Sequence, residues 1–128
     1  MFILLMTILG CSQHSGCTDL FAYSATIELT DQEGVAITDA NITYTVDGVE
    51  GTYVESWEDG TYVVGGEESG DFVVDIYAQI PDEDGCCTDI GEATLEFTIE
   101  SDECHVIPQS FNPDLEWSTA CIDIEECA

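Results

Sequence analysis

The sequence predicts an all-β fold: an antiparallel sandwich of seven to eight strands held together by disulfides. Apolar and polar residues alternate over most of the chain, which is typical of strands with one buried and one wet face. Turn-forming pairs that end in Gly fall between the alternating runs, where Gly supplies the positive φ of tight turns. The chain also has seven cysteines, a high number that is typical of small exported domains.

The strands follow from these runs in chain order. The clearest runs begin at Phe21, Ile42, Phe72 and Ala93, and shorter segments lie on either side of the Asp59-Gly60 turn. Other turns are expected at Glu33-Gly34, Asp47-Gly48, Ser69-Gly70 and Asp84-Gly85. The expected strands are therefore 19–30, 39–47, 51–58, 61–65, 71–80, 92–100 and 104–112, with 115–124 as the eighth.

The charge of the chain excludes several classes of function. The sequence has 28 acidic residues and no Lys or Arg, for a formal net charge of −28. A chain without these cations has no electrostatic footprint for nucleic acid and no arginine clamp for phosphate. Acidic runs such as Asp82-Glu83-Asp84 attract divalent cations weakly, so we expect no cofactor beyond weak surface binding of Ca²⁺.

We expect no catalytic site. A Ser–His–acid hydrolase would need His14 or His105 as its base, and the sequence has no Gly-x-Ser-x-Gly turn to present a nucleophile. The acids are expected in turns and on wet strand faces rather than as a pair in a cleft.

The aromatic residues offer a candidate binding surface. Tyr53, Trp57, Tyr62 and Tyr77 could form a platform on one sheet that stacks sugars or packs a partner. Against this, we expect Trp57 in the core and Trp117 as an exposed anchor.

The N-terminus carries a short apolar run that ends in a Gly and a Cys. The stretch Ile8-Leu9-Gly10-Cys11, at the end of an apolar run, resembles the lipobox of bacterial lipoproteins. The resemblance implies that residues 1–10 are a removed signal peptide and that Cys11 is the lipidation site, with residues 11–18 as lipidated N-terminus and tether. Ser12 implies sorting to the outer membrane. The alternatives are a buried N-terminal strand or an uncleaved anchor, and the run is too short to span a bilayer as a helix.

The remaining chain, 19–128, is one β-sandwich domain, and part of it resembles a known family. The segment from Ala25 to Tyr44 is similar to the opening of carboxypeptidase regulatory-like, transthyretin-like domains, in which a strand, an Asp-x-x-Gly turn and a short apolar link precede an Ala that leads the second strand. The resemblance implies a transthyretin- or immunoglobulin-like Greek-key sandwich in an extracytoplasmic setting, without catalysis. The matching positions are Asp31, Gly34, Ile37 and Ala40, with the later strand at Gly70–Ala78 and Cys104-His105 before the last strand.

The cysteines after Cys11 form an even set of six, for which three disulfides are expected. If seven strands alternate up and down, Cys17 and Cys104 begin two strands at the same pole, which predicts Cys17–Cys104. Cys86 and Cys87 lie at the opposite pole and are expected to pair with Cys121 and Cys127, in either order. Metal ligation by Cys86, Cys87, Cys104, His105 and His14 is the alternative, but the chain has no Cys-x₂-Cys pair.

These observations predict a non-catalytic, lipid-anchored protein of the cell envelope with a binding or structural role at the cell surface. Its expected partners are the membrane, through the lipid anchor, and a protein or glycan whose identity the sequence leaves open. The alternative is a subunit of a cation-dependent surface assembly or adhesin that pairs strand edges between copies.

Overall fold

The computed structural model describes residues 21–123 and 125–127, and this part of the chain is all-β, as predicted. It contains nine strands and a short 3₁₀-helix near the C-terminus. Their bounds are β1 Tyr23–Glu28, β2 Asn41–Val46, β3 Val49–Glu50, β4 Val54–Ser56, β5 Thr61–Gly66, β6 Gly70–Pro81, β7 Cys87–Ile99, β8 Gln109–Phe111, β9 Glu116–Cys121 and the 3₁₀-helix Glu125–Cys127.

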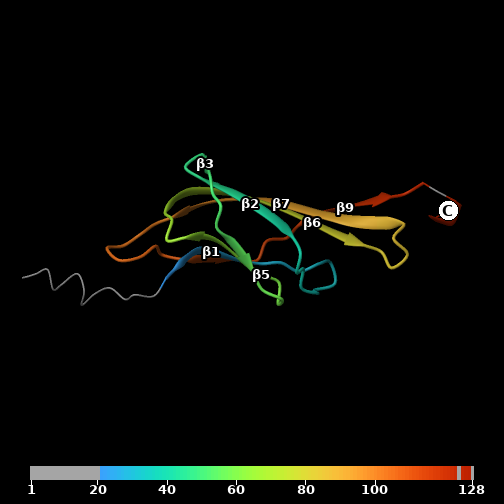
Figure 1. Ribbon diagram of the computed structural model, residues 1–128, viewed down its shortest axis with the longest axis horizontal. Coiled ribbons are helices and arrows are strands. Elements are labelled where there is room, and N and C mark those ends of the chain that lie inside the picture. The colour runs from blue at the N-terminus through green and yellow to red at the C-terminus, as the bar shows by residue number, and fades with distance from the viewer. Residues whose placement is uncertain (1–20, 124, 128) are drawn as a thin grey trace, which may run out of the picture.

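The strands form two sheets that face each other (Figure 1). One sheet has five strands in the order β3-β2-β6-β7-β9, and the other has four in the order β4-β5-β1-β8. The longest pairing is the antiparallel β6–β7 hairpin, which runs from Gly70↔Ile99 to Pro81↔Thr88. The described chain changes sheet between β1 and β2, β3 and β4, β5 and β6, β7 and β8, and β8 and β9.

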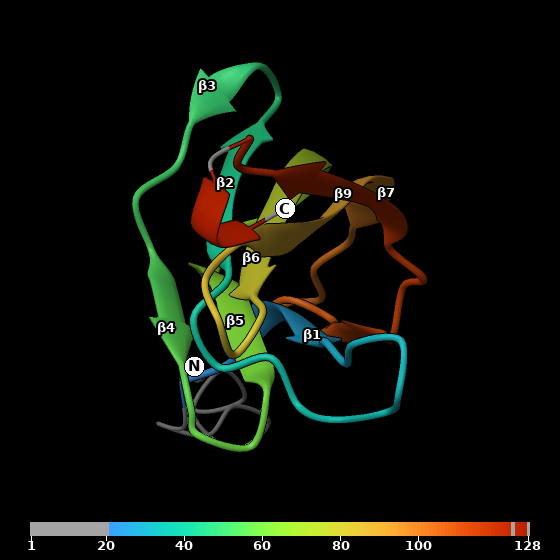
Figure 2. The same ribbon diagram turned by 90° about the vertical axis from the view of Figure 1, so that its right-hand side faces the viewer.

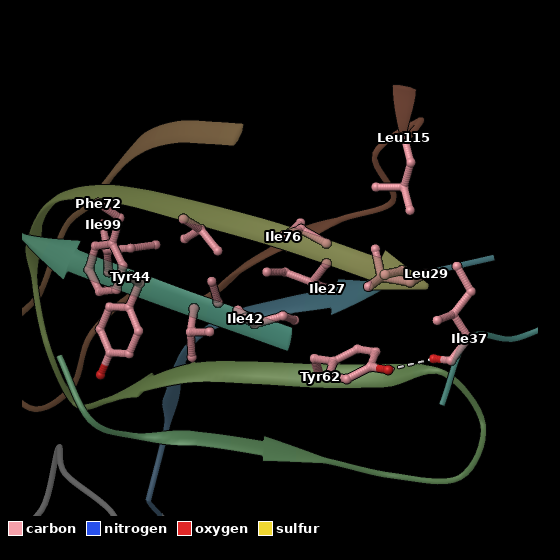
Figure 3. Close-up of a cluster of buried hydrophobic side chains, with 14 of the residues drawn as sticks. Ile27, Leu29, Ile37, Ile42, Tyr44, Tyr62, Phe72, Ile76, Ile99 and Leu115 are labelled. Atoms are coloured by element: carbon pink, nitrogen blue, oxygen red, sulfur yellow. Dashed lines mark hydrogen bonds between the residues drawn. The ribbon is translucent and has the colours of Figure 1, made fainter. Parts of the chain in front are cut away.

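The core lies between the sheets and follows the predicted alternation (Figure 3). On β6 the burial pattern alternates strictly, so Phe72, Val74 and Ile76 face inward while Asp71 and Asp75 face solvent. Tyr62 is 2 % exposed, and its hydroxyl donates to the carbonyl of Ile37 at 2.6 Å. The main core comprises Ala25, Ile27, Leu29, Ile37, Ile42, Tyr44, Tyr62, Val64, Phe72, Val74, Ile76, Ala78, Ile99, Val106 and Leu115.

The prediction of a purely antiparallel sandwich of seven to eight strands is wrong in two respects. First, β8 pairs with β1 in parallel, through Ala25↔Gln109 to Ile27↔Phe111. The chain reaches β8 by crossing from the opposite sheet after β7, and a crossover of this kind delivers a strand parallel to its neighbour, which a hairpin cannot do. Second, the described strands number nine, because the short β3 was not predicted; the expected 51–58 strand is reduced to β4.

The split between β3 and β4 has a local cause at Gly51. The amide of Gly51 donates to the Tyr44 carbonyl at 2.9 Å, and a Cβ at this position would collide with the Tyr44 ring. The Tyr44 hydroxyl then accepts the amide of Tyr53 at 3.1 Å. The chain therefore leaves the five-stranded sheet around the Tyr44 side chain and joins the four-stranded sheet, as Figure 2 shows between β3 and β4.

Two other expected strands differ in length from their prediction. β7 begins at Cys87, earlier than the predicted 92–100, because its first half pairs with β9. The predicted 104–112 strand is reduced to β8, because the chain turns at Asp102–His105, closed by a bridge between Ser101 and Val106.

Two disulfides join the start of β7 to the C-terminal segment. Cys86 bonds Cys127 with their Cα atoms 5.4 Å apart, and Cys87 bonds Cys121 with Cα atoms 4.0 Å apart. This is one of the two orders that the sequence left open. Cys87 and Cys121 are direct partners in the β7–β9 register, so this bond fastens the edge strand itself. Cys104 is disulfide-bonded, and its predicted partner Cys17 lies outside the described residues.

The two bonds are nested, so removing them should not be additive. When Cys87–Cys121 is intact, Cys86–Cys127 closes only a short additional loop in the unfolded chain. When only one of the two bonds is present, it closes a loop of more than 30 residues, because the sequence separations are 34 and 41. We expect removal of either bond by paired Cys→Ser substitutions to lower the free energy of unfolding by about 2.5 kcal/mol, and removal of both by about 6 kcal/mol, which exceeds the sum of the two.

Urea unfolding at constant pH measures these differences, with the wild-type chain and both paired variants run in parallel. Equal losses that simply add, or a double variant no worse than either single one, would contradict the nested arrangement.

Candidate functional site

Four aromatic side chains gather on the outer face of the four-stranded sheet, and we call Phe21, Tyr23, Tyr53 and Trp57 the aromatic strip. Their ring centroids are 5.4 Å apart for Phe21–Tyr23, 5.6 Å for Phe21–Tyr53, 6.1 Å for Tyr23–Tyr53 and 6.0 Å for Tyr23–Trp57. These distances lie in the range of favourable aromatic pairs. Phe21 is 52 % exposed and Trp57 43 % exposed, so the strip is in contact with solvent.

The fold builds the strip from two segments that are distant in sequence. Tyr23 begins β1 and Phe21 lies two residues before it, while Tyr53 and Trp57 flank the edge strand β4. Gly66 is the register partner of Tyr23, and a Cβ on it would collide with the Phe21 ring. The absence of a side chain at Gly66 therefore leaves the space that the Phe21 ring occupies.

A break in the alternation of β1 accounts for the outward position of Tyr23. The β1–β5 ladder pairs Tyr23 with Gly66 and Ala25 with Val64, and Ser24 and Ala25 are both fully buried. Opposite Ser24 lies Gly65, whose φ is +77° and where a Cβ would meet the Ser24 side chain at 2.7 Å. Strict alternation places Tyr23 on the core face with Ala25. The backbone conformation at Gly65 interrupts this alternation, and the Tyr23 side chain therefore lies on the outer face with the strip.

The hydroxyl of Tyr53 in the strip is held by an acidic neighbour. The Tyr53 hydroxyl donates to the Glu55 carboxylate, and this hydrogen bond is the main reason why the pKa of Tyr53 is raised above its ordinary value. Thr26 and Glu55 flank Val63 in the register, so hydroxyl and carboxylate groups lie beside the rings.

The predicted platform is thus confirmed only in part. Tyr53 and Trp57 belong to the strip, but Tyr62 is in the core and Tyr77, 38 % exposed, lies on the outer face of the other sheet. The expected roles of the two tryptophans are reversed: Trp57 is exposed, and Trp117 is partly buried against the core. The Trp57 amide is bonded to the Thr61 carbonyl at 2.9 Å, in the turn before β5.

A second surface lies on the outer face of the five-stranded sheet, an open depression of about 640 Å³. The Thr94 hydroxyl donates to the Asp75 carboxylate at 2.9 Å, across the β6–β7 ladder. Glu92 and Glu116 are direct register partners on β7 and β9, an unfavourable pair of like charges. Within the described part of the chain, no group of three or more His, Cys, Asp or Glu side chains is placed to hold a metal ion.

The described histidine, His105, lies beside a carboxylate that the sequence did not identify as its partner. Its Nδ1 is 2.6 Å from Glu67, which also accepts the backbone amides of Ala22 at 3.0 Å and Val106 at 3.3 Å. Partial desolvation acts to raise the pKa of Glu67, but the hydrogen bonds from His105 and the two amides outweigh it and hold the pKa below its ordinary value. Glu67 therefore ties three segments together: the start of β1, the turn before β6 and the loop before β8.

The other site residues predicted from the sequence fall outside the described residues. These are the signal peptide 1–10, the lipidation site Cys11, the tether 11–18 with Ser12 and His14, and Cys17.

We expect the Glu67 contact to give a pH-dependent stability. Because the folded pKa of Glu67 lies below its ordinary value of 4.5, the ionised carboxylate stabilises the fold above that pH, and this contribution disappears as the pH falls through the lowered folded value. Glu67→Gln should lower the urea midpoint at pH 7, and the difference from wild type should shrink by pH 3.

Glu96→Gln, on the exposed outer face of β7, is the matched control because it removes the same charge without these three contacts. Equal midpoint shifts in both variants, or a Glu67 difference that persists unchanged at pH 3, would show that the contact does not stabilise the fold.

No protein-family model, curated protein or solved structure matches this chain. No helix in the described residues is long and apolar enough to cross a membrane.

Proposed function

We propose that this chain is a non-catalytic, lipid-anchored protein of the bacterial cell envelope that binds a partner through its β-sandwich. The observation that carries the proposal is the pair of disulfides at the start of β7, Cys86–Cys127 and Cys87–Cys121. Disulfides of this kind persist in oxidising compartments outside the cytoplasm and are rare inside it. The lipobox-like Ile8-Leu9-Gly10-Cys11 then supplies the means of attachment.

The proposed fold is a transthyretin-like Greek-key sandwich. In its support, neighbours in each sheet are distant in sequence, as with β1–β5 and β2–β6, and the chain passes repeatedly between the sheets. The positions of the family resemblance also have matching structural roles. The Asp31 carboxylate accepts the amides of Glu33 at 2.8 Å and Val35 at 2.9 Å, which closes the turn, and Ile37 follows as a core residue.

The engagement of the acids supports a role without catalysis. Asp31, Asp59, Asp84 and Asp102 each accept a backbone amide within their own turn. A carboxylate that caps a turn in this way is a structural acceptor, and its exposed position keeps it in water. Binding surfaces on the two sheet faces are then the parts of the molecule available for function.

A second candidate function is a subunit of a cation-dependent surface assembly. It is favoured by β9, which is an edge strand and carries four consecutive uncharged residues, Trp117–Ala120. Many edge strands are protected by Lys side chains, which this chain lacks entirely. Repulsion between copies would oppose such pairing until cations neutralise acids such as Glu92 and Glu116 beside the edge.

The intact mass of the protein from a bacterial host, before and after reduction, tests the first proposal. We expect loss of residues 1–10, added acyl mass on Cys11 and a gain of about six daltons on reduction, one per thiol formed by three disulfides. The Cys11→Ser variant should retain its N-terminus unacylated. An intact Met1 with free thiols would place the chain in the cytoplasm and reject the proposal.

Sedimentation velocity over a concentration series, with calcium and with sodium chloride at equal ionic strength, tests the second candidate. An assembly predicts growth of the sedimentation coefficient in calcium alone, because divalent cations bridge carboxylates that sodium only screens. A constant monomer in both salts would reject it and leave the lone anchored domain.

A further inference from the structure

We infer that the aromatic strip is a binding surface for a single, uncharged oligosaccharide chain. This inference rests on the proposed binding role of the domain and names the class of its ligand. It is carried by three properties of the strip: exposed aromatic surface, a border of hydrogen-bond acceptors, and the charge of the molecule around it.

The aromatic rings of the strip form one exposed apolar surface. Phe21 and Trp57 are 52 % and 43 % exposed, and both are in ring contact with Tyr23, which joins them into one apolar surface. None of the four rings belongs to the core between the two sheets. Aromatic rings bind the C–H faces of sugars through apolar contact while the sugar hydroxyls remain at the periphery, where polar groups can meet them.

The border of the strip suits those hydroxyls. Glu55 and Thr26 lie on either side of Val63 in the register, and Glu28 lies opposite Thr61 at the next position. Carboxylates only accept hydrogen bonds, and sugar hydroxyls are ready donors. The Tyr53 hydroxyl is held by Glu55, so its ring is fixed before a ligand arrives, which reduces the entropy lost on binding.

The charge of the molecule selects among ligands. With a net charge of −28 and no Lys or Arg, the protein repels anionic glycans, phosphorylated ligands and anionic membrane surfaces. An uncharged sugar chain experiences no such repulsion.

The tilt of the rings defines the form of the ligand. The interplanar angles along the strip are 81°, 41°, 41° and 73°, so the rings do not form one plane. A flat crystalline polysaccharide could contact only one or two of them at a time. A soluble chain can turn at its glycosidic bonds and follow all four.

Native gel electrophoresis of the full chain, in gels containing hydroxyethylcellulose, mannan, xylan or dextran, tests the inference. We expect at least one polysaccharide to retard the wild-type protein, and Trp57→Ala or Tyr53→Ala to weaken binding about tenfold or more, as for loss of one aromatic anchor. Tyr77→Ala is the matched control, because Tyr77 is a similarly exposed aromatic residue on the other sheet. Retardation that survives Trp57→Ala, or no retardation in any gel, would overturn the inference.

Two further measurements identify other occupants of the strip. In a Trp117→Phe background, emission reports Trp57 alone, since the chain has two tryptophans. A blue shift with phosphatidylcholine vesicles in the unacylated Cys11→Ser protein would assign the strip to the membrane surface and overturn the inference. Resistance of Trp57 to acrylamide quenching in the full chain would show that the protein itself covers the strip, which would also overturn it. Neither outcome affects the mass measurement on Cys11, so the proposed location in the cell envelope is tested separately.

Discussion

The structure depends on how carboxylates are satisfied in a chain that has no Lys or Arg. His105 is the one basic side chain among the described residues, and it binds Glu67. Several other acids accept hydrogen bonds from backbone amides or hydroxyls instead. Asp47 accepts the amide of Asp71 at 2.8 Å, and Asp71 in turn accepts the Thr98 hydroxyl at 2.8 Å. Acids thereby fix the turns and link strands on the outer face, and the core supplies the cohesion that ion pairs cannot.

The sequence predicts the strands well where burial alone determines them. The β6 and β7 runs have one face in the core and one in water, so their alternation is visible without any tertiary information. The turns with Gly are equally local, as at Asp47-Gly48, where both residues have positive φ. The parts that the sequence did not predict depend on distant residues. The sheet change at Gly51 needs the Tyr44 ring, and the parallel β1–β8 pair needs the route of the chain after β7.

The same distinction applies to the candidate site. Tyr53 could be identified from the chain as a candidate platform residue, whereas Trp57, named beside it, was expected in the core and is exposed. Phe21 and Tyr23 could not be identified as platform residues, since the apolar alternation of the first strand assigns both to the core. The only local signal was the Gly65-Gly66 pair, and its meaning depends on the register that sets Gly66 against Tyr23. Likewise, Glu67 and His105 are neighbours only because two crossing loops meet at the start of β1.

The covalent bonds at the C-terminal end also determine how the molecule would respond to a pulling force. An edge strand that is held only by hydrogen bonds peels away one residue at a time when its end is pulled. Here the terminal 3₁₀-helix and β9 are both bonded to neighbouring residues at the start of β7. Tension applied at the C-terminus therefore bypasses β9 and acts on β7, whose ladder with β6 extends from Thr88 to Ile99. A domain anchored at its other end would transmit that tension through its longest hairpin and into its core, while the edge strand β9 is protected.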